Sequence, residues 1–439
     1  MYSNIEFTNL SLCLTKQLDS QTKKKDGIYF TPKSIVKDMM DTVLKVFENI
    51  NKIRTLRVLE PSCGSGQILQ GVLEHFPNRG VFIDAFETNE IIVNHVKTQF
   101  KQQQNVNIVL GDFLTSNNNN TSVDSYYDVI LGNPPFFGLK KDQQVKKYPL
   151  YNEWIDYGRP NVYVLFLLKS LDLLTPGTGI LSFVLPVNFL NCMYYKKVRR
   201  RIIRSCTICS LTIYDQANFI DTKQKVVLLT LMNTPSKFQN NTFVIHEHIL
   251  NTESNIQKLK RICEGSTSLA KLGYTVNVGS VVWTKHKAHL YADNIREPNR
   301  VPILFASDIP QSTMGTRFSL TSSGFKNPVK KRYIDLVAAG IPANRCIVSP
   351  TLVMSRGYGS SGKYALRAAT VDNNGDPFIA ENHVICIRGP PTRPFINISF
   401  SDPRTEEFVS IFCANSALNV HEILDYLPIF CSTKTQTFN

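Results

Sequence analysis

The chain has 439 residues, of which 43% are hydrophobic and 19% are charged, and this composition excludes disordered, collagenous and coiled-coil proteins. Its 49 lysines and arginines exceed its 35 aspartates and glutamates, so the formal net charge at pH 7 is +14. The excess is spread along the chain, with +8 up to residue 240 and +6 after it. A basic globular protein commonly meets a polyanion, and nucleic acid is the first candidate.

The sequence gives no sign of a membrane or secreted protein. The longest uncharged apolar stretch, Gly179 to Tyr195, is broken by a proline and two asparagines and falls short of the ~18–20 apolar residues of a membrane helix. The N-terminus lacks a basic region followed by an apolar core. Cys206 and Cys209 have no second pair at zinc-site spacing. We therefore interpret the cysteines as free thiols, predict no metal site and expect a cytoplasmic location.

Short apolar runs alternate with helical patterns through the first half of the chain. The expected strands are Leu56–Leu59, Val81–Phe86, Asn107–Leu110, Tyr127–Leu131, Ile180–Leu185, Thr207–Tyr214 and Lys225–Leu231. The expected helices are Gln67–His75, Ile91–Gln103 and Val162–Leu174. Strands that alternate with helices predict an α/β fold, in which a parallel Rossmann-like sheet carries helices on both faces.

The pattern changes near residue 235. A turn-rich break at Thr234–Asn241 is followed by short strand-like runs separated by Gly, Pro, Asn and Ser, with few helical patches such as Ser254–Cys263. We therefore expect two domains, residues 1–240 and residues 241–439, of which the second is a mixed α+β domain.

The first three strands end in residues that suit an adenosine-containing ligand. After the first strand, Gly64 and Gly66 let the backbone turn tightly and approach a ligand closely. Glu87 ends the second strand, where an acidic residue can hold ribose hydroxyls. Asp112 and Phe113 follow the third strand, where the carboxylate could accept an adenine amino proton while the ring packs on the base. Three successive strand ends in this order predict one nucleoside site.

The fourth strand ends in Asn133-Pro-Pro-Phe136, which is either an ordinary Pro-Pro turn or a site for an amino group conjugated to an aromatic ring. Such a nitrogen is a poor nucleophile because its lone pair is delocalised. The side-chain oxygen of Asn133 and the carbonyl of Pro134 could accept its N–H bonds and draw it toward tetrahedral geometry. The prolines would hold that carbonyl rigidly, and Phe136 could stack on the exposed base.

Three segments resemble S-adenosylmethionine-dependent adenine-N6 DNA methyltransferases. Asp128-Val-Ile-Leu-Gly-Asn-Pro-Pro-Phe136 looks like their catalytic motif, and Glu60-Pro-Ser-Cys-Gly-Ser-Gly66 resembles their methionine-binding loop. Gly27-Ile-Tyr-Phe-Thr-Pro-Lys-Ser-Ile-Val36 is similar to the segment that precedes this loop in the gamma class. The resemblance covers roughly residues 25–235. Residues 276–287, 301–305 and 381–385 look like parts of the target-recognition domains of type II modification enzymes.

The resemblance implies S-adenosylmethionine as the cofactor and gives each matching position a role. It implies that the cofactor is held by Thr31, Pro32, Glu60, Pro61, Gly64, Gly66, Glu87, Asp112, Phe113 and Phe166. The first six would surround the methionine end, while Glu87 would bind the ribose. The implied catalytic residues are Asn133, Pro134, Pro135 and Phe136, and Phe219 would stack on the flipped base.

Basic residues are candidates for contacts with the DNA backbone. The first set directly follows the catalytic turn and comprises Lys140, Lys141, Lys146 and Lys147. A second set on a predicted helix is either a phosphate-binding cluster or a solvated surface, and comprises Arg199, Arg200, Arg201 and Arg204. In the second domain the candidates are Lys285, Arg356 and Lys363. Lys363 ends a P-loop-like stretch, but Tyr364 replaces the Ser or Thr that would bind magnesium, so a basic loop over DNA is expected there instead.

The sequence therefore predicts a sequence-specific methyltransferase that acts on the N6 amino group of an adenine flipped out of double-stranded DNA. The alternatives are methylation of RNA adenine or of a protein glutamine, and a catalytically inactive DNA-binding relative. A separate restriction endonuclease of the same specificity is a candidate partner.

Overall fold

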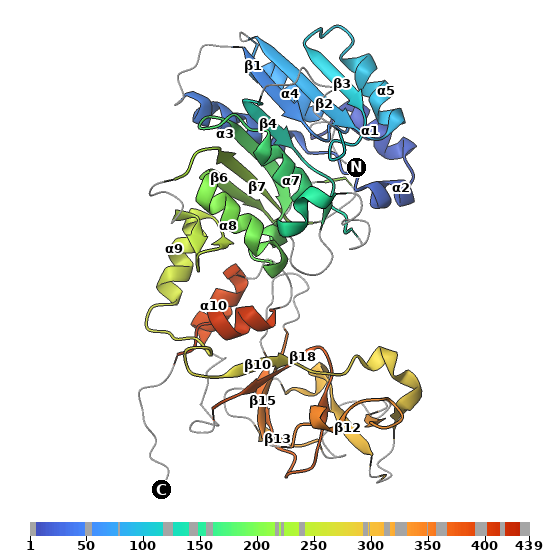
Figure 1. Ribbon diagram of the computed structural model, residues 1–439, viewed down its shortest axis with the longest axis vertical. Coiled ribbons are helices and arrows are strands. Elements are labelled where there is room, and N and C mark those ends of the chain that lie inside the picture. Colours follow the sequence, from blue (N-terminus) through green and yellow to red (C-terminus); the bar gives the residue numbers. More distant parts are fainter. Residues whose placement is uncertain are drawn as a thin grey trace. The chain divides into compact units, whose positions relative to one another are not determined.

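The computed structural model describes residues 6–48, 55–77, 80–116, 126–139, 148–154, 161–215, 219–220, 224–236, 242–292, 297, 299–310, 317–320, 332–348, 350–356, 367–390, 402–412 and 418–430. The chain divides into two compact units, Met1–Ile256 and Gln257–Asn439 (Figure 1). The division falls within helix α9 (Glu253–Ile262), later than the boundary expected at residue 240. The reason is a small hairpin of β8 (Val244–Ile245) and β9 (Ile249–Leu250), whose strand β9 packs on a helix of the first unit.

A seven-stranded sheet forms the centre of the first unit, in the order β3-β2-β1-β4-β5-β7-β6. Its strands are β1 (Leu56–Glu60), β2 (Val81–Glu87), β3 (Val106–Leu110), β4 (Val129–Gly132), β5 (Ile180–Pro186), β6 (Thr207–Tyr214) and β7 (Val226–Met232). Strands β1 to β5 are parallel, which confirms the predicted α/β sheet. Every residue of β5 is buried, as expected for a strand covered on both faces.

Strand β7 differs from the expected parallel sheet. It lies between β5 and β6 and runs antiparallel to both. The chain between β6 and β7 spans only residues 215–225, and a parallel return needs a crossover of a dozen or more residues, usually a helix. The short connection therefore makes β7 reverse, while its mostly buried apolar sequence places it inside the sheet.

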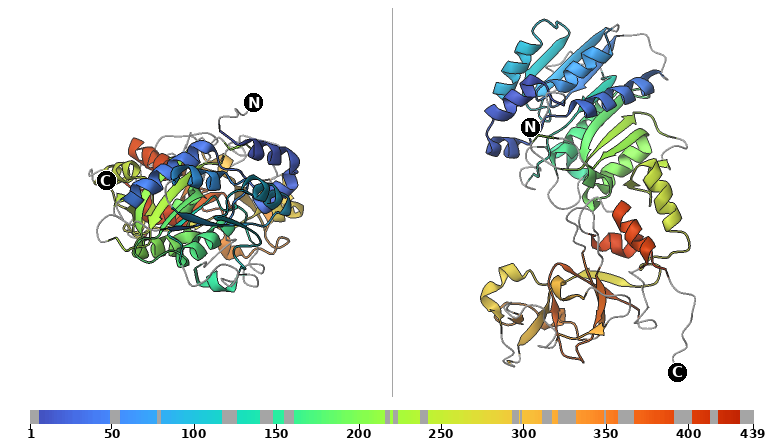
Figure 2. Two further views of the ribbon diagram at one scale, coloured as in Figure 1. Left: turned by 90° about the horizontal axis from the view of Figure 1, so that it is seen from above. Right: turned by 180° about the vertical axis from the view of Figure 1, so that it is seen from behind.

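Helices cover both faces of this sheet (Figure 1 and Figure 2). On one face α3 (Lys33–Glu48), α4 (Gln67–His75) and α5 (Glu90–Gln99) share one apolar cluster with alternate strand residues. On the other face α7 (Val162–Asp172) contacts β5, and α8 (Lys196–Ser205) contacts β6. Two short helices, α1 (Asn9–Gln17) and α2 (Ser20–Asp26), precede α3, and the sequence analysis predicted none of these three.

The second unit consists mainly of short strands. One sheet has the order β10-β18-β15-β16-β13 and the other β11-β14-β12-β17, and each has its own apolar cluster. The strands are β10 (Thr275–Val278), β11 (Leu290–Tyr291), β12 (Arg300–Leu304), β13 (Arg317–Phe318), β14 (Tyr333–Asp335), β15 (Thr351–Ser355), β16 (Ala368–Val371), β17 (Ile379–Ala380) and β18 (Val384–Arg388). Helix α10 (Pro403–Phe412) adds the helical part of a mixed α+β unit.

The structure bears on two predictions from the sequence, which concern membrane-spanning helices and the state of the cysteines. Within the described ranges, no helix has the length and apolarity needed to cross a membrane. The cysteines in those ranges are free thiols. Burial raises the pKa of the Cys209 thiol to about 11, so this thiol stays protonated at neutral pH.

Arg199 on α8 stabilises the fold and is not a phosphate ligand. Its side chain is fully buried, with Nε donating to the carbonyl of His248 at 2.6 Å. Nη1 donates to the carbonyls of Phe189 and Cys192 at 2.8 and 2.7 Å. The guanidinium thus joins α8 to the loop after β5 and to the β8–β9 hairpin. Both alternatives considered for these arginines, a phosphate-binding cluster and a solvated surface, are wrong for Arg199, because its side chain is fully buried.

Replacing Arg199 by alanine should destabilise the first unit by about 3 kcal/mol or more, because three buried carbonyls lose a charged donor. The free energy of unfolding can be measured by urea denaturation, following the fluorescence of Trp154 in a Trp283→Phe background. The matched control is Arg204→Ala on the exposed side of the same helix, which should stay within about 0.5 kcal/mol of the parent. Equal stabilities of the two variants would contradict the role given to Arg199.

Candidate active site

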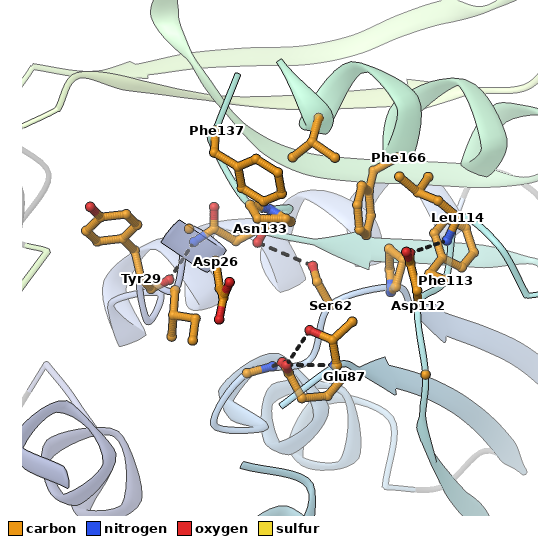
Figure 3. A pocket seen from close by; sticks show the side chains of 18 of the residues that line it. Asp26, Tyr29, Ser62, Glu87, Asp112, Phe113, Leu114, Asn133, Phe137 and Phe166 are labelled. Atoms are coloured by element: carbon orange, nitrogen blue, oxygen red, sulfur yellow. Dashed lines mark hydrogen bonds between the residues drawn. The ribbon is translucent and has the colours of Figure 1, made fainter. Parts of the chain in front are cut away.

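A cavity of about 290 Å³ runs along the carboxyl ends of β3, β2, β1 and β4 (Figure 3). Because parallel strands end at the same edge, the residues that follow them meet there. Of the residues singled out from the sequence, the cavity is lined by Pro61, Gly64, Glu87, Asp112, Phe113, Asn133, Pro135 and Phe166.

Glu87 is fixed by backbone donors around the glycine loop. Its Oε2 accepts from the N–H of Gly64 at 3.1 Å, and its Oε1 accepts from the N–H groups of Thr88 and Asn89 at 2.8 and 2.9 Å. Gly64 has φ +49, a left-handed conformation that side chains rarely adopt. Burial raises the pKa of Glu87 despite these donors. A carboxylate held in this way at the end of β2 can accept hydrogen bonds from ligand hydroxyls.

Two other residues of this loop lie behind the cavity instead of lining it. Glu60 is 2% exposed, and its Oε2 has no hydrogen-bond partner among the described residues. Burial, with the charge of Glu87 adding to it, raises the pKa of Glu60 well above the ordinary value. Gly66 has φ +72, and a Cβ there would lie 2.7 Å from the ring of Phe100. Gly66 is therefore required by the packing of α4 against α5.

One end of the cavity suits a flat, amino-bearing ring. Phe113 and Phe166 lie with ring centroids 5.5 Å apart, and Figure 3 shows both near Asp112. One oxygen of Asp112 accepts from the N–H of Leu114 at 3.0 Å. The carboxylate is thus directed by its own turn, beside two apolar ring surfaces.

The amide group of Asn133 is held in one orientation. Its Nδ2 donates to the carbonyl of Tyr29 and to Oγ1 of Thr31, each at 3.1 Å. The Tyr29 carbonyl can only accept, so the nitrogen must face it. The amide oxygen is buried and has no hydrogen-bond partner among the described residues. The hydroxyl of Ser62 donates to the backbone carbonyl of Asn133 at 3.4 Å, which joins this turn to the glycine loop.

The N-terminal segment closes over this turn. Gly27 has φ +67, and a Cβ on it would lie 2.9 Å from Cβ of Pro135 and 3.0 Å from the N of Phe136. Only glycine allows this approach without displacement of the turn. Thr31 and Pro32, expected to close over the methionine end, are buried, do not line the cavity, and lead into α3. The hydroxyl of Thr31 contacts the Asn133 amide instead.

Two phenylalanines expected to meet the target base lie outside the cavity lining. Phe136 is half-buried and makes an edge-to-face contact with Tyr163 at 5.8 Å. Phe219 is 4% exposed and belongs to the apolar cluster under α3. Stacking of Phe219 on a base would require that its ring first be uncovered. Pro134 is buried within the turn.

The structure describes only some of the residues that the sequence predicts to bind DNA. Lys140, Lys141, Lys146, Lys147 and Lys363 lie outside the described residues. In the second unit Lys285 is exposed, while Arg356 is half-buried and its Nε has no hydrogen-bond partner among the described residues.

Several lining residues were not identified from the sequence. Ser62 lies within the quoted glycine loop, and Phe137 directly follows the quoted turn, so both could have been included. Asp26 precedes Gly27 and presents a carboxylate that has no partner among the described residues. Tyr29 acts through its backbone carbonyl, and because every residue has one, this contact cannot be predicted from the residue type. Tyr148 enters from a segment that carries no recognisable motif.

The cavity lies at the carboxyl ends of β1 to β4, in a sheet whose β7 runs antiparallel beside β5, and this is where the sequence resemblance places S-adenosylmethionine. The residues present fit this cofactor. Glu87 offers acceptors for hydroxyl groups, Asp112 offers them for an amino group, and Phe113 with Phe166 offers flat apolar surfaces.

Comparison with known proteins gives the family. Residues 3–219, which lie in the first unit, match the Eco57I restriction-modification methylase family. The chain is 26% identical to the type II methyltransferase M.CvrRI of Paramecium bursaria Chlorella virus XZ-6E, over 97% of this chain and 99% of that protein. It is also 26% identical to the modification methylase CviBIII of Paramecium bursaria Chlorella virus NC1A, over 97% of this chain and all of that protein. A match to the type II methyltransferase M.AccI of Acinetobacter calcoaceticus has 29% identity over 57% of this chain and 45% of that protein. The protein is a DNA methyltransferase.

Replacing Glu60 by glutamine should change how the stability of the first unit depends on pH. The raised pKa means that the folded protein keeps a proton which the unfolded chain releases near pH 4.5. The stabilising contribution of Glu60 is complete below that pH and is lost as pH rises toward the folded-state pKa. Relative to the parent, Glu60→Gln should therefore become more stable as pH rises from about 5 to about 8. Urea denaturation across this range measures the difference, and a constant difference would contradict the buried, protonated state.

Proposed function

We propose that the enzyme transfers the methyl group to the N6 amino group of an adenine flipped out of double-stranded DNA, in a sequence-specific manner and as a gamma-class enzyme. The observation that carries this proposal is the buried amide oxygen of Asn133, which has no hydrogen-bond partner among the described residues and whose nitrogen is already engaged by Tyr29 and Thr31. An acceptor without a donor at a reaction site is costly to maintain, and a substrate N–H group would satisfy it.

The chemistry of an aromatic amine explains why such an acceptor is needed. The N6 lone pair of adenine is delocalised into the ring, so the nitrogen attacks poorly while it is planar. Hydrogen bonds from its two N–H groups to Asn133 Oδ1 and to the carbonyl of Pro134 would draw the nitrogen toward tetrahedral geometry and direct its lone pair. When bound, S-adenosylmethionine supplies the electrophilic methyl group, and the proton released from the methylated amine passes to solvent. Pro135 holds the turn, and Phe136 would flank the base.

The position of the turn supports base flipping. Asn133 lies at the edge of the cavity, between the glycine loop and the N-terminal segment. A base stacked in a duplex cannot bring its N6 group to such a point, so enzymes that modify bases extrude the target nucleotide. In the same proposal Glu87 binds the ribose of the cofactor, and Asp112 accepts from the amino group of its adenine.

We assign target recognition to the second unit. Candidate DNA contacts there are Lys285, Arg356 and Lys363, while Lys140, Lys141, Lys146 and Lys147 would contact phosphates beside the catalytic turn. Modification enzymes of this kind act alongside an endonuclease that cuts the same unmodified sequence, and the proposal includes such a partner.

Replacing Asn133 by alanine should reduce methyl transfer by ~10²–10³-fold or more, the usual effect of removing one preorganised polar group. Affinity for S-adenosylmethionine, measured by calorimetry, should stay within a few-fold of the parent, because the cofactor is held mainly by other residues. Transfer with labelled cofactor is measured on separate samples of DNA, RNA and protein, and mass spectrometry of the nucleosides and amino acids identifies the product. The matched control is Asn191→Ala, a buried asparagine that does not line the cavity.

Each result of that experiment has a definite consequence. N6-methyladenine from the parent and none from Asn133→Ala supports the proposal. A methylated cytosine, methylation confined to RNA, or methylated glutamine in protein would refute the adenine assignment. Activity of Asn133→Ala close to that of the parent would refute the role of the turn.

A chain truncated after Ile256 should bind S-adenosylmethionine but lose its preference for the DNA sequence that the full protein modifies. That sequence is identified by single-molecule sequencing of modified DNA, and a thermal melt first establishes that the truncated chain folds. Binding to an unmethylated duplex that contains this sequence is then compared with binding to a scrambled duplex, at two salt concentrations. If the folded truncation discriminates between the duplexes as strongly as the full chain, recognition does not reside in the second unit.

A further inference from the structure

The carboxylate of Asp112 is held by a residue from a distant part of the chain. The hydroxyl of Tyr148 donates to Oδ2 of Asp112 at 3.1 Å, while the N–H of Leu114 donates to Oδ1 at 3.0 Å. Tyr148 is 6% exposed, and both Tyr148 and Asp112 line the cavity. Each carboxylate oxygen therefore has one donor that fixes its direction.

We propose that Tyr148 is a positioning residue which, by orienting Asp112, sets the preference of the cofactor site for adenine over a purine that lacks the amino group. This inference rests on the proposed role of Asp112 as acceptor for that amino group. Tyr148 acts through Asp112 and needs no contact with the cofactor itself.

The hydrogen-bonding capacity of Asp112 supports this role. An ionised carboxylate offers about four acceptor sites, so it has the capacity to accept from Tyr148, from Leu114 and from an adenine amino group at once. A purine ring that lacks the amino group offers no donor at this position, so the carboxylate loses a hydrogen bond to the ligand. When Tyr148 holds the Asp112 carboxylate in one orientation, the carboxylate cannot rotate to find another donor, and a purine without the amino group binds less well.

The backbone of this loop is anchored independently of Tyr148. Lys169 on α7 donates through Nζ to the carbonyl of Phe113 at 2.5 Å and to the carbonyl of Ser116 at 2.8 Å. Its Nζ also lies 4.7 Å from the centroid of the Phe113 ring. Since Lys169 holds the main chain, the freedom that remains near the adenine site is the side-chain rotation of Asp112. Tyr148 restrains that rotation.

The test measures discrimination between two ligands that differ only at the amino position. The full-length protein is titrated by calorimetry with S-adenosylhomocysteine and with its 6-deamino purine analogue, in which hydrogen replaces the amino group and the ring nitrogens are unchanged. The parent should prefer the first by about 10- to 100-fold, the range expected for a hydrogen bond to a charged group. Tyr148→Phe should reduce this preference by about 3- to 10-fold, and Asp112→Asn should abolish most of it.

The chain offers a closely matched control in Tyr151. It lies on the short 3-10 helix Pro149–Trp154 that follows Tyr148, is 8% exposed, and does not line the cavity. Tyr151→Phe removes the same hydroxyl group from the same segment, and it should leave the preference within about twofold of the parent.

The outcomes separate this inference from the function on which it rests. A reduced preference in Tyr148→Phe and not in Tyr151→Phe supports it. If Tyr148→Phe weakens the binding of both ligands by the same factor, the role of Tyr148 is only structural and the inference fails. If Asp112→Asn loses the preference while Tyr148→Phe keeps it, the inference fails and the adenine site stands. If Asp112→Asn also keeps the preference, the proposed role of Asp112 fails, and the inference fails with it.

Discussion

The orientation of one amide group organises the active site. The Asn133 nitrogen faces the carbonyl of Tyr29, a group that can only accept a hydrogen bond, so the amide cannot be turned around without leaving two acceptors opposed. The oxygen is consequently buried at the cavity, with no hydrogen-bond partner in the part of the chain that the structure describes. A mobile side chain would satisfy itself with water or backbone, but this one is prevented from doing so. The restriction depends on main-chain atoms about a hundred residues earlier in the sequence.

That dependence explains why the segment before the sheet belongs to the catalytic unit. Gly27 lies against Pro135 more closely than any residue with a Cβ could, and Thr31 supplies the second acceptor for the amide. Helix α3 then packs on the sheet through its buried apolar face and fixes this segment in place. The Asn133 turn is therefore held by contacts from two places in the sequence, by Ser62 within the glycine loop and by Gly27 and Tyr29 before it.

The sequence predicts the site correctly where residues with suitable side chains stand at the ends of predicted parallel strands. Glu87, Asp112 and Asn133 each follow a strand, and a parallel sheet brings strand ends together, so their meeting could be predicted without coordinates. Prediction from the sequence failed for contacts between segments that share no pattern and meet only in the folded protein. The polarity of Arg199 predicts exposure, yet three carbonyls from two separate segments converge on it. The direction of β7 follows from the length of a connection, and the contact of Tyr148 with Asp112 joins segments that share no pattern.

The burial of Arg199 has a consequence for how the charge of the molecule is understood. Arg201 is paired with Asp172, and Arg200 lies 3.5 Å from Glu247, so three of the arginines around α8 are already engaged within the protein. Counterions are released from DNA only by cations that reach phosphates, and each such contact contributes about −0.9 to the slope of log affinity against log salt. The net charge of +14 is therefore a poor guide to ionic-strength dependence. The salt response of this enzyme on DNA should report a much smaller set of exposed cations, and measuring it would count them.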